Sequence, residues 1–195
     1  MIYVLIGRSG SGKSSIEREI ATERPEFFRV ISDTTRPIRE GEVDGVDYHY
    51  LPREEFTKGI LCGDYIEHTC YNGWYYGINK KHIDLTLGDY ICVTNPSGYE
   101  QLKKHFGDSV VGIVIHTDDK QRLLNYLHRE ERPNCYECCR RFIADADDFA
   151  EIEKDPSLHH VENIIGSLNV TIKIILEFID SVRGDGNVKH KRETQ

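Results

Sequence analysis

Eight residues near the start of the chain, GRSGSGKS from Gly7 to Ser14, combine three glycines with a lysine and hydroxyl groups. They fit the pattern G-x-x-x-x-G-K-[ST] between an apolar run and a helical pattern. The glycines let backbone N–H groups turn toward a polyphosphate, which also meets the positive end of the helix. Lys13 would contact the β and γ phosphates, and Ser14 would offer a hydroxyl to Mg²⁺. A nucleoside triphosphate site is therefore predicted, formed by Arg8, Ser9, Gly10, Ser11, Gly12, Lys13, Ser14 and Ser15.

The nine residues SDTTRPIRE, from Ser32 to Glu40, form a second group whose side chains favour phosphate. Arg36 and Arg39 each offer a planar guanidinium that matches the oxygens of a phosphate monoester. The hydroxyls that could join them belong to Ser32, Thr34, Thr35 and Tyr48. In an alternative interpretation the two arginines form ion pairs on a solvated loop, where such pairs contribute little to stability. The acids available for that pairing are Glu40, Glu42 and Asp44.

Taken with the glycine-rich loop, this stretch resembles the guanylate kinase family. The acceptor region of that family reads S-x-T-T-R-x-x-R-x-G-E-x-D-G-x-D-Y, which matches Ser32 to Tyr48, and a later segment ends in Y-Y-G. Here that segment is EHTCYNGWYYG, from Glu67 to Gly77. The match runs in order over about residues 2–98, with weaker agreement as far as Ile179.

The resemblance implies a nucleoside monophosphate kinase that converts GMP or dGMP to the diphosphate with ATP and Mg²⁺, by direct in-line transfer. It also implies which side chains hold the acceptor monophosphate, namely Arg36, Arg39, Tyr48 and Tyr76. Ser32 and Glu67 would face the base. The chemistry agrees, because guanine presents two adjacent donors that one carboxylate can accept, whereas adenine presents an unprotonated ring nitrogen.

Residues 118–154 would correspond to the family's lid, a polar helical arm interrupted at the sequence RPN. The family brings two arginines from this arm to the transferring phosphoryl group, where they neutralise its charge. Arg129 and Arg141 fall near those places, with Arg132 and Arg140 as adjacent candidates. The resemblance thus implies a catalytic set of Lys13, Arg36, Arg129 and Arg141.

Two positions depart from the family pattern. Guanylate kinases usually carry D-I-D before the helix that follows this strand, but the chain reads CVTNPSG, so Asn95 lies at or beside the acid that contacts guanine. Ile78 replaces a small hydroxyl residue after Y-Y-G. These changes leave open a kinase with altered or broadened base specificity. A non-catalytic binding module is a further alternative, although Gly12, Lys13 and Ser14 are intact. The family often places an asparagine near the base of ATP, and Asn163 matches that position only if the alignment contains a short gap.

The elements that position these residues follow from hydrophobic periodicity. The apolar runs IYVLI, FFRVI, DYICV and VVGIVI alternate with helical patterns, which predicts an α/β fold with a parallel sheet flanked by helices. Short antiparallel strands and brief helices are expected for an insertion at residues 33–88. The prediction is one domain, 1–183, with the core at 1–32, 89–117 and 155–183. A helix is expected near residues 167–182, followed by a disordered tail at 184–195.

Composition limits the partners. The chain has 33 acidic and 25 basic residues, a formal charge of -8, which disfavours nucleic acid and anionic membrane surfaces. The first apolar run has only six residues, so we expect neither a leader nor a membrane span, and hence a cytoplasmic protein. We expect a monomer or homodimer. Reduced thiols are expected for the six cysteines, with a zinc site at Cys135 and Cys138 as the alternative.

Overall fold

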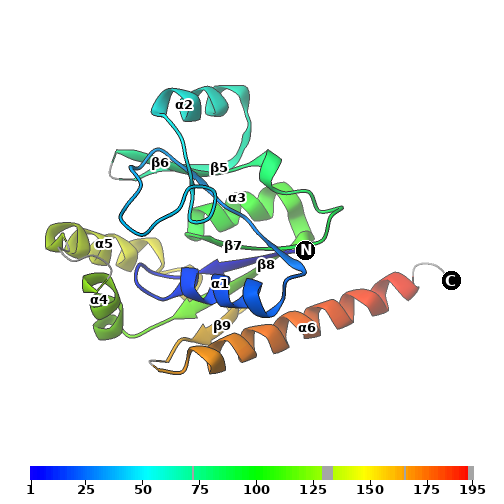
Figure 1. Ribbon diagram of the computed structural model, residues 1–195. Coiled ribbons are helices and arrows are strands. Elements are labelled where there is room, and N and C mark those ends of the chain that lie inside the picture. The colour runs from blue at the N-terminus through cyan, green and yellow to red at the C-terminus, as the bar shows by residue number, and fades with distance from the viewer. Residues whose placement is uncertain (72, 129–133, 165, 193–195) are drawn as a thin grey trace. The chain divides into compact units, whose positions relative to one another are not determined.

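The computed structural model describes residues 1–71, 73–128, 134–164 and 166–192. Figure 1 shows the course of the chain through its helices and strands. In chain order these are β1 (Ile2–Ile6), α1 (Lys13–Glu23), β2 (Phe27–Arg29), β3 (Asp33–Thr34), β4 (His49–Tyr50), α2 (Arg53–Cys62), β5 (Tyr65–Tyr71), β6 (Trp74–Asn79), η1 (Lys80–His82), β7 (Asp89–Thr94), α3 (Pro96–Phe106), η2 (Gly107–Ser109), β8 (Val110–His116), α4 (Asp119–Leu127), α5 (Cys135–Asp148), η3 (Ile152–Lys154), β9 (His159–Glu162) and α6 (Leu168–Arg192).

The larger sheet has five strands in the order β2-β7-β1-β8-β9. Strand β2 pairs with β7 in parallel, and β8 pairs with β9 in parallel. All five residues of β1 are fully buried, as expected for a strand covered on both faces. The four apolar runs singled out in the sequence are β1, β2, β7 and β8, so the prediction of a parallel α/β sheet flanked by helices is confirmed.

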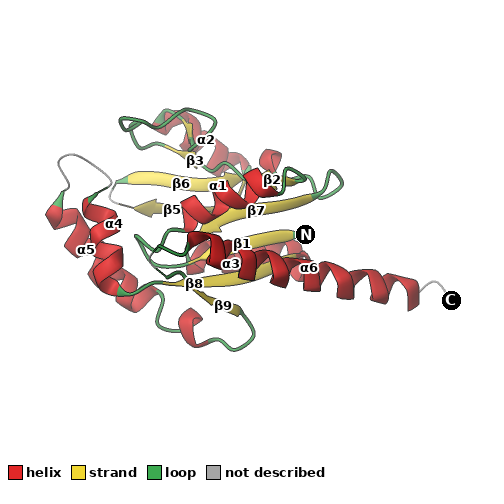
Figure 2. Ribbon diagram, turned by 60° about the horizontal axis from the view of Figure 1, so that its bottom comes forward, coloured by secondary structure: helices red, strands yellow, loops and turns green. Residues whose placement is uncertain are grey.

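The smaller sheet has four strands in the order β4-β3-β6-β5, drawn in yellow in Figure 2. Strands β5 and β6 form an antiparallel hairpin, β3 pairs antiparallel with β6, and β4 pairs in parallel with β3. All four strands come from residues 33–79, within the predicted insertion. Strands β3 and β4 have only two residues each, and the segment between them, residues 35–48, is loop.

The chain divides into two compact units. One unit contains residues 1–4 and 25–112, and the other contains residues 5–24 and 113–195. The smaller sheet and the acceptor motif belong to the first unit, whereas the glycine-rich loop, α4 and α5 belong to the second. The division into a core, an insertion and a lid stays a prediction.

The predicted helical arm forms two helices, α4 and α5. Each begins at a side-chain cap: Asp118 accepts a hydrogen bond from the Gln121 backbone N–H, and Asn134 accepts one from that of Glu137. Residues 129–133, which include Arg129 and Arg132, lie outside the described part of the chain.

The final helix is longer than the sequence indicates. Its apolar face includes the buried residues Ile172, Ile175, Leu176 and Ile179. The helix continues to Arg192, past its expected end near residue 182, and the disorder expected for the tail at 184–195 stays a prediction. Extending an existing helix adds one hydrogen bond for each residue fixed, without a new nucleation cost, and therefore needs no further apolar face. None of the described helices is long and apolar enough to cross a membrane.

Candidate active site

The glycine-rich loop turns tightly between β1 and α1. Gly10 and Gly12 have φ angles of +79° and +88°, in the left-handed region that favours glycine. A Cβ atom at Gly10 would lie 2.5 Å from the backbone oxygen of Arg122, and one at Gly12 would lie 2.6 Å from Nδ2 of Asn163. Both glycines are therefore required by conformation and by close packing.

The start of α1 suits an anion. Its N-cap is Gly12, which has no capping side chain, and no acidic residue lies in the first turn. The first N–H groups of the helix and its dipole therefore present positive potential. Nζ of Lys13 lies 2.5 Å from the oxygen of Gly7 and 2.9 Å from that of Arg8, which places the ammonium group at the loop. The exposed Ser14 has the hydroxyl that Mg²⁺ prefers, so these residues fit a magnesium-bound triphosphate.

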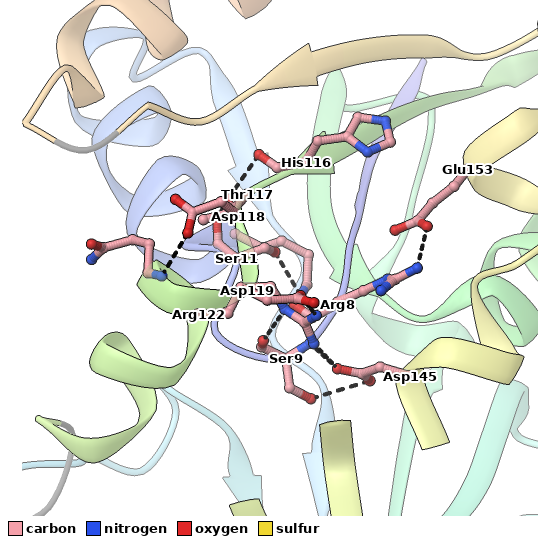
Figure 3. Close-up of polar contacts among 12 residues, drawn as sticks. Arg8, Ser9, Ser11, His116, Thr117, Asp118, Asp119, Arg122, Asp145 and Glu153 are labelled. Atoms are coloured by element: carbon pink, nitrogen blue, oxygen red, sulfur yellow. Dashed lines mark hydrogen bonds and ion pairs between the residues drawn. The ribbon is translucent and has the colours of Figure 1, made fainter. Parts of the chain in front are cut away.

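The helices α4 and α5 hold the loop through a buried ion pair that the sequence reasoning missed (Figure 3). Arg122 of α4 is 1% exposed, and its Nη2 lies 2.5 Å from Oδ2 of Asp145 on α5. The same guanidinium donates to the backbone oxygen of Ser9 and to Asp119. Oδ2 of Asp145 also accepts the Ser9 N–H at 2.8 Å. Only the spacing of Asp119 and Arg122 on one helix face could have indicated this role beforehand.

A second charged pair lies on the same loop. Nη2 of Arg8 donates to Oε2 of Glu153 at 2.5 Å, and Figure 3 shows the two side chains pointing toward each other. Nε of Arg8 is buried without a hydrogen-bond partner among the described residues. A cavity of about 370 Å³ opens beside this pair, lined among others by Ser11, Thr117 and Arg122.

A second cavity, of about 400 Å³, is lined in part by the loop residues Gly10 and Gly12. Its wall includes Asn125, Tyr126 and Asn163. Nδ2 of Asn163 donates to the Ser11 oxygen at 2.9 Å, and its Oδ1 accepts from the hydroxyl of Thr171. The structure therefore brings Asn163 to the loop, although the sequence matched it only across a gap.

In the other unit, Arg36 is held by acids and aromatic rings. It is 8% exposed, and its Nη2 lies 2.9 Å and 3.0 Å from the two carboxylate oxygens of Glu42. Its guanidinium carbon lies 5.5 Å from the ring centre of Tyr48 and 5.7 Å from that of Tyr50. Burial lowers the pKa of Arg36, but the hydrogen bonds and charge of Glu42 outweigh it, so the pKa is raised. The ion pair foreseen as the alternative is present, but it lies beside the tyrosines of the motif.

Glu42 organises this cluster. Its carboxylate accepts the backbone N–H of Arg39 at 2.9 Å and the hydroxyl of Tyr50 at 2.7 Å. Burial raises the pKa of Glu42, but the hydrogen bonds from Arg39, Tyr50 and Arg36 outweigh it and lower the pKa overall. Tyr48 also packs against Tyr76, with ring centres 6.0 Å apart. The structure thus brings together the side chains of Arg36, Tyr48 and Tyr76, and it ties the backbone of Arg39 to the same cluster through Glu42.

Strand pairing places the proposed base contact on the same sheet face as Tyr76. Thr34 pairs with both Tyr50 and Tyr76, and Glu67 pairs with Ile78, two residues along from Tyr76. Paired residues share a face of a sheet, and residues two apart in a strand do so as well. The carboxylate of Glu67 therefore lies on the face that carries the tyrosines.

The carboxylate of Glu67 is buried. The residue is 7% exposed, and burial raises its pKa to about 7, although a backbone hydrogen bond from Ile78 opposes the rise. Ile78 is itself fully buried. A Cβ atom at Gly98 would lie 3.2 Å from Oε2 of Glu67, so the small residue at the start of α3 leaves room for the carboxylate. A buried carboxylate of this kind is suited to accept hydrogen bonds from a ligand.

The other two residues predicted to contact the base are Asn95 and Ser32. Asn95 is exposed and caps α3, with its Oδ1 accepting the Gly98 N–H at 2.8 Å. That oxygen is already engaged in the fold, so the base contact of Asn95 stays a prediction. The backbone oxygen of Ser32 accepts from the His49 N–H at 2.9 Å, which fixes the main chain at this point.

Two of the predicted lid arginines, Arg140 and Arg141, lie within the described residues, and both form ion pairs with Glu137 on α5. Nε of Arg141 lies 2.8 Å from Glu137, and Arg140 donates to the same carboxylate through two nitrogens. The hydrogen bond from Arg140 is the main cause that lowers the pKa of Glu137 to about 2, with Arg141 adding to it against burial. The two predicted partners, Arg129 and Arg132, lie outside the described residues, so the catalytic lid set stays a prediction.

Comparison with known protein sequences identifies relatives over more than half of the chain. The chain is similar to guanylate kinases from Chlorobium luteolum, 40% identical over 117 residues, and Pseudomonas fluorescens, 39% identical over 106 residues. These alignments cover 58% and 53% of this chain, and 59% and 52% of the two relatives, so the chain spans little more than half of their length.

Solved structures show the same fold. A guanylate kinase from Anaplasma phagocytophilum superposes with a TM-score of 0.71 at 21% identity, over 93% of this chain and 85% of that one. A gluconokinase from Sinorhizobium meliloti 1021 gives 0.55 at 12% identity, over 96% and 95% of the two chains. The family model for guanylate kinase matches residues 1–165. With the phosphate loop and the acceptor motif in place, the chain belongs to the guanylate kinase family.

Proposed function

We propose that the protein phosphorylates GMP or dGMP with ATP by direct in-line transfer. The observation that carries the proposal is the buried carboxylate of Glu67 on the sheet face of Tyr50 and Tyr76. Guanine offers its N1–H and exocyclic amine side by side, and one carboxylate accepts both. Adenine would set a lone pair against the same carboxylate, and a site with buried polar groups strongly disfavours such a mismatch.

The acceptor phosphate would bind at the cluster of Arg36, Arg39, Tyr48 and Tyr76. Glu42 restrains the guanidinium of Arg36 and the backbone of Arg39 before any ligand arrives, which reduces the ordering cost of binding. A phosphate dianion carries more charge than a carboxylate and accepts from several donors at once, so it can compete with Glu42 for Arg36. Its oxygen is already anionic, so the attack needs no strong general base.

The donor triphosphate would bind to the loop from Arg8 to Ser15, with Lys13 at its β and γ phosphates. Mg²⁺, which Ser14 would hold, neutralises charge on these phosphates when bound. The cavity beside Asn125, Tyr126 and Asn163 offers space for the base of the donor. Arg141, together with Arg129, would stabilise the transferring group once freed from Glu137.

A second candidate function is a kinase with altered or broadened base specificity. Ile78 favours it because this apolar, fully buried residue pairs with Glu67, where a hydroxyl would offer a further polar contact. The capping of α3 by Asn95 favours it as well. A non-catalytic binding module is less favoured, since the loop retains Gly12, Lys13 and the uncapped start of α1. A cytoplasmic location and a monomeric or homodimeric state stay predictions.

Steady-state kinetics with ATP and Mg²⁺ against GMP, dGMP, AMP, CMP and dTMP tests the proposal. We expect selectivity for GMP and dGMP, with kcat/KM falling about 100-fold in Glu67→Gln because an amide cannot accept both donors of guanine. Glu54→Gln, which changes an exposed acid on α2, is the control. Comparable turnover of several bases would favour the second candidate, and the absence of any turnover would refute both kinases.

A further inference from the structure

The back of the smaller sheet carries a group of side chains that the kinase reaction does not use. Asp33 of β3, His49 of β4 and His82 of η1 bring three ligand atoms within 4.8 Å of one another. Among the residues that the structure describes, no other group of three His, Cys, Asp or Glu side chains is gathered in this way. We propose that Asp33, His49 and His82 bind a divalent transition-metal ion, with Zn²⁺ as the natural occupant.

Strand alternation separates this group, the Asp33–His49–His82 site, from the acceptor cluster. Asp33 pairs with His49, while the next residue, Thr34, pairs with Tyr50. Successive side chains of a strand point to opposite faces. The three ligands therefore face away from the tyrosines that carry the phosphate cluster, and an ion bound there is not the Mg²⁺ of ATP.

The ligand set matches the preference of zinc. Two imidazoles and one carboxylate are common ligands for Zn²⁺, which leaves a fourth position for water. Oδ1 of Asp33 already lies 2.9 Å from Nε2 of His82, close to the spacing of about 3.3 Å between ligands of a tetrahedral zinc ion. The two imidazole rings stack with centres 4.6 Å apart, and the ligand atoms lie within 4.8 Å of one another, so the ring of His49 has to rotate for its nitrogen to reach the same ion. To bind the ion, Nε2 of His82 must carry no hydrogen, so the neutral imidazole holds its proton on Nδ1 and Oδ1 of Asp33 turns from the hydrogen bond to the metal.

The surroundings support the ligands in the manner of known metal sites. The hydroxyl of Tyr65 donates to Oδ2 of Asp33 at 2.8 Å, which leaves Oδ1 for the ion. Asp33 is fully buried, and the side chain of His82 is 16% exposed, so an ion can enter from one side. The ring of Tyr65 is in turn stacked on Phe56 of α2. An ion at this site would tie η1 to β3 and β4, the strands that carry the acceptor motif.

Equilibrium dialysis of the full chain with Zn²⁺, without nucleotide, tests the site independently of kinase activity. Because exposed thiols are also zinc ligands, and Cys135 and Cys139 are exposed on one helix, the experiment uses the Cys135→Ser/Cys139→Ser variant beside the wild type. We expect both proteins to bind one equivalent at the Asp33–His49–His82 site. Co²⁺ in place of zinc should give the visible bands of a four-coordinate N/O site without a thiolate band.

Three substitutions locate the ion. His82→Gln keeps a donor to Asp33 but removes the ligand, so the tight equivalent should be lost, and His49→Gln should have the same effect. Tyr65→Phe keeps all three ligands and should weaken binding about 10-fold to 100-fold. His105→Gln, on the exposed face of α3, is the control and should bind as the wild type does.

The proposal is overturned if the wild type binds no zinc, if His82→Gln and His49→Gln retain full affinity, or if the cysteine variant alone loses the ion. Circular dichroism of the metal-free variants separates loss of a ligand from loss of the fold. Because two separate histidine variants are made, the test still works if one of them fails to fold.

Discussion

Glu67 illustrates how one side chain depends on its neighbours for its chemistry. A carboxylate on a surface hairpin would be solvated and negative, but Glu67 is 7% exposed beside the fully buried Ile78. Burial disfavours the charged form and raises the pKa to about 7. The protein thus keeps a carboxyl group that exchanges its proton near neutral pH, where a base with two donors can select the ionised form.

This shift predicts a pH-dependent cost to stability. The folded-state pKa of Glu67 lies above its ordinary value of 4.5, so its favourable contribution is fully present below pH 4.5 and is lost as pH rises through about 7. The Glu67→Gln variant has no carboxyl group at this position, so it does not lose stability in this way as the pH rises. We expect the free energy of unfolding of the variant, relative to the wild type, to increase between about pH 5 and pH 8 by on the order of 3 kcal/mol.

Urea unfolding at both pH values measures this difference, with Glu100→Gln as the control because its carboxylate is exposed on α3. The control should show no comparable change with pH. An equal difference between Glu67→Gln and wild type at both pH values would contradict a buried carboxyl group with a raised pKa.

Arg36 shows that an ion pair and a binding site are compatible descriptions of one residue. Its pairing with Glu42 has the appearance of a loop salt bridge, yet the pair is packed against Tyr48 and Tyr50. A guanidinium kept in place by a carboxylate is already oriented when phosphate arrives. We propose that the two interpretations left open by the sequence describe Arg36 without and with a bound phosphate.

At the scale of elements, the helices α4 and α5 hold the phosphate loop as well as carrying the proposed lid arginines. Arg122 and Asp145 form a buried bridge between them, and both contact the backbone of Ser9. Nδ2 of Asn125 adds a hydrogen bond to the Gly10 oxygen at 2.8 Å. A displacement of these helices would therefore also move the backbone of the phosphate loop.

Asp145→Asn tests this coupling. The change leaves the buried guanidinium of Arg122 without its main charge partner, although the amide oxygen can still accept the Ser9 N–H. Removing one partner of a buried ion pair costs roughly 3 kcal/mol. We expect urea unfolding to show a loss of this size, and kinetics to show a higher KM for ATP with a smaller effect on the KM for GMP.

Asp147→Asn, an exposed acid on the same helix, is the matched control and should change neither quantity. The double variant Arg122→Met/Asp145→Asn should lose less than the sum of the single changes, because no unpaired charge remains buried. Additive losses would show that Arg122 and Asp145 do not act as a pair.

The smaller sheet shows how one short element can carry two kinds of site. Strands β3 and β4 have two residues each, and their alternation sends Thr34 and Tyr50 to one face and Asp33 and His49 to the other. Acceptor binding and the proposed zinc site therefore share a backbone without sharing side chains.

For the whole molecule, α6 extends beyond what folding of the chain requires. Ile172, Ile175, Leu176 and Ile179 are buried, but from Asp185 onward the sequence contains a single apolar residue, Val188. A stretch with so little apolar surface contributes little to folding.

Deleting residues 185–195 should therefore change the free energy of unfolding by no more than about 0.5 kcal/mol and leave turnover intact. Ile175→Ala should lose about 2–5 kcal/mol, because it opens a cavity in the core, whereas the exposed neighbour Ile174→Ala should have little effect. Thermal unfolding of the three proteins makes the comparison. A large loss on deletion would mean that the end of α6 is packed.

The sequence by itself determined the phosphate loop, the acceptor motif, the four apolar strands and the fold class, because each is encoded in local spacing or hydrophobic period. It did not indicate the Arg122–Asp145 bridge, whose partners lie 23 residues apart on different helices. It named Glu42 only as one of three acids for a loop ion pair, and it missed the gathering of Asp33, His49 and His82. Only the tertiary structure decided these features, since burial, pKa and ligand geometry depend on which distant segments pack together.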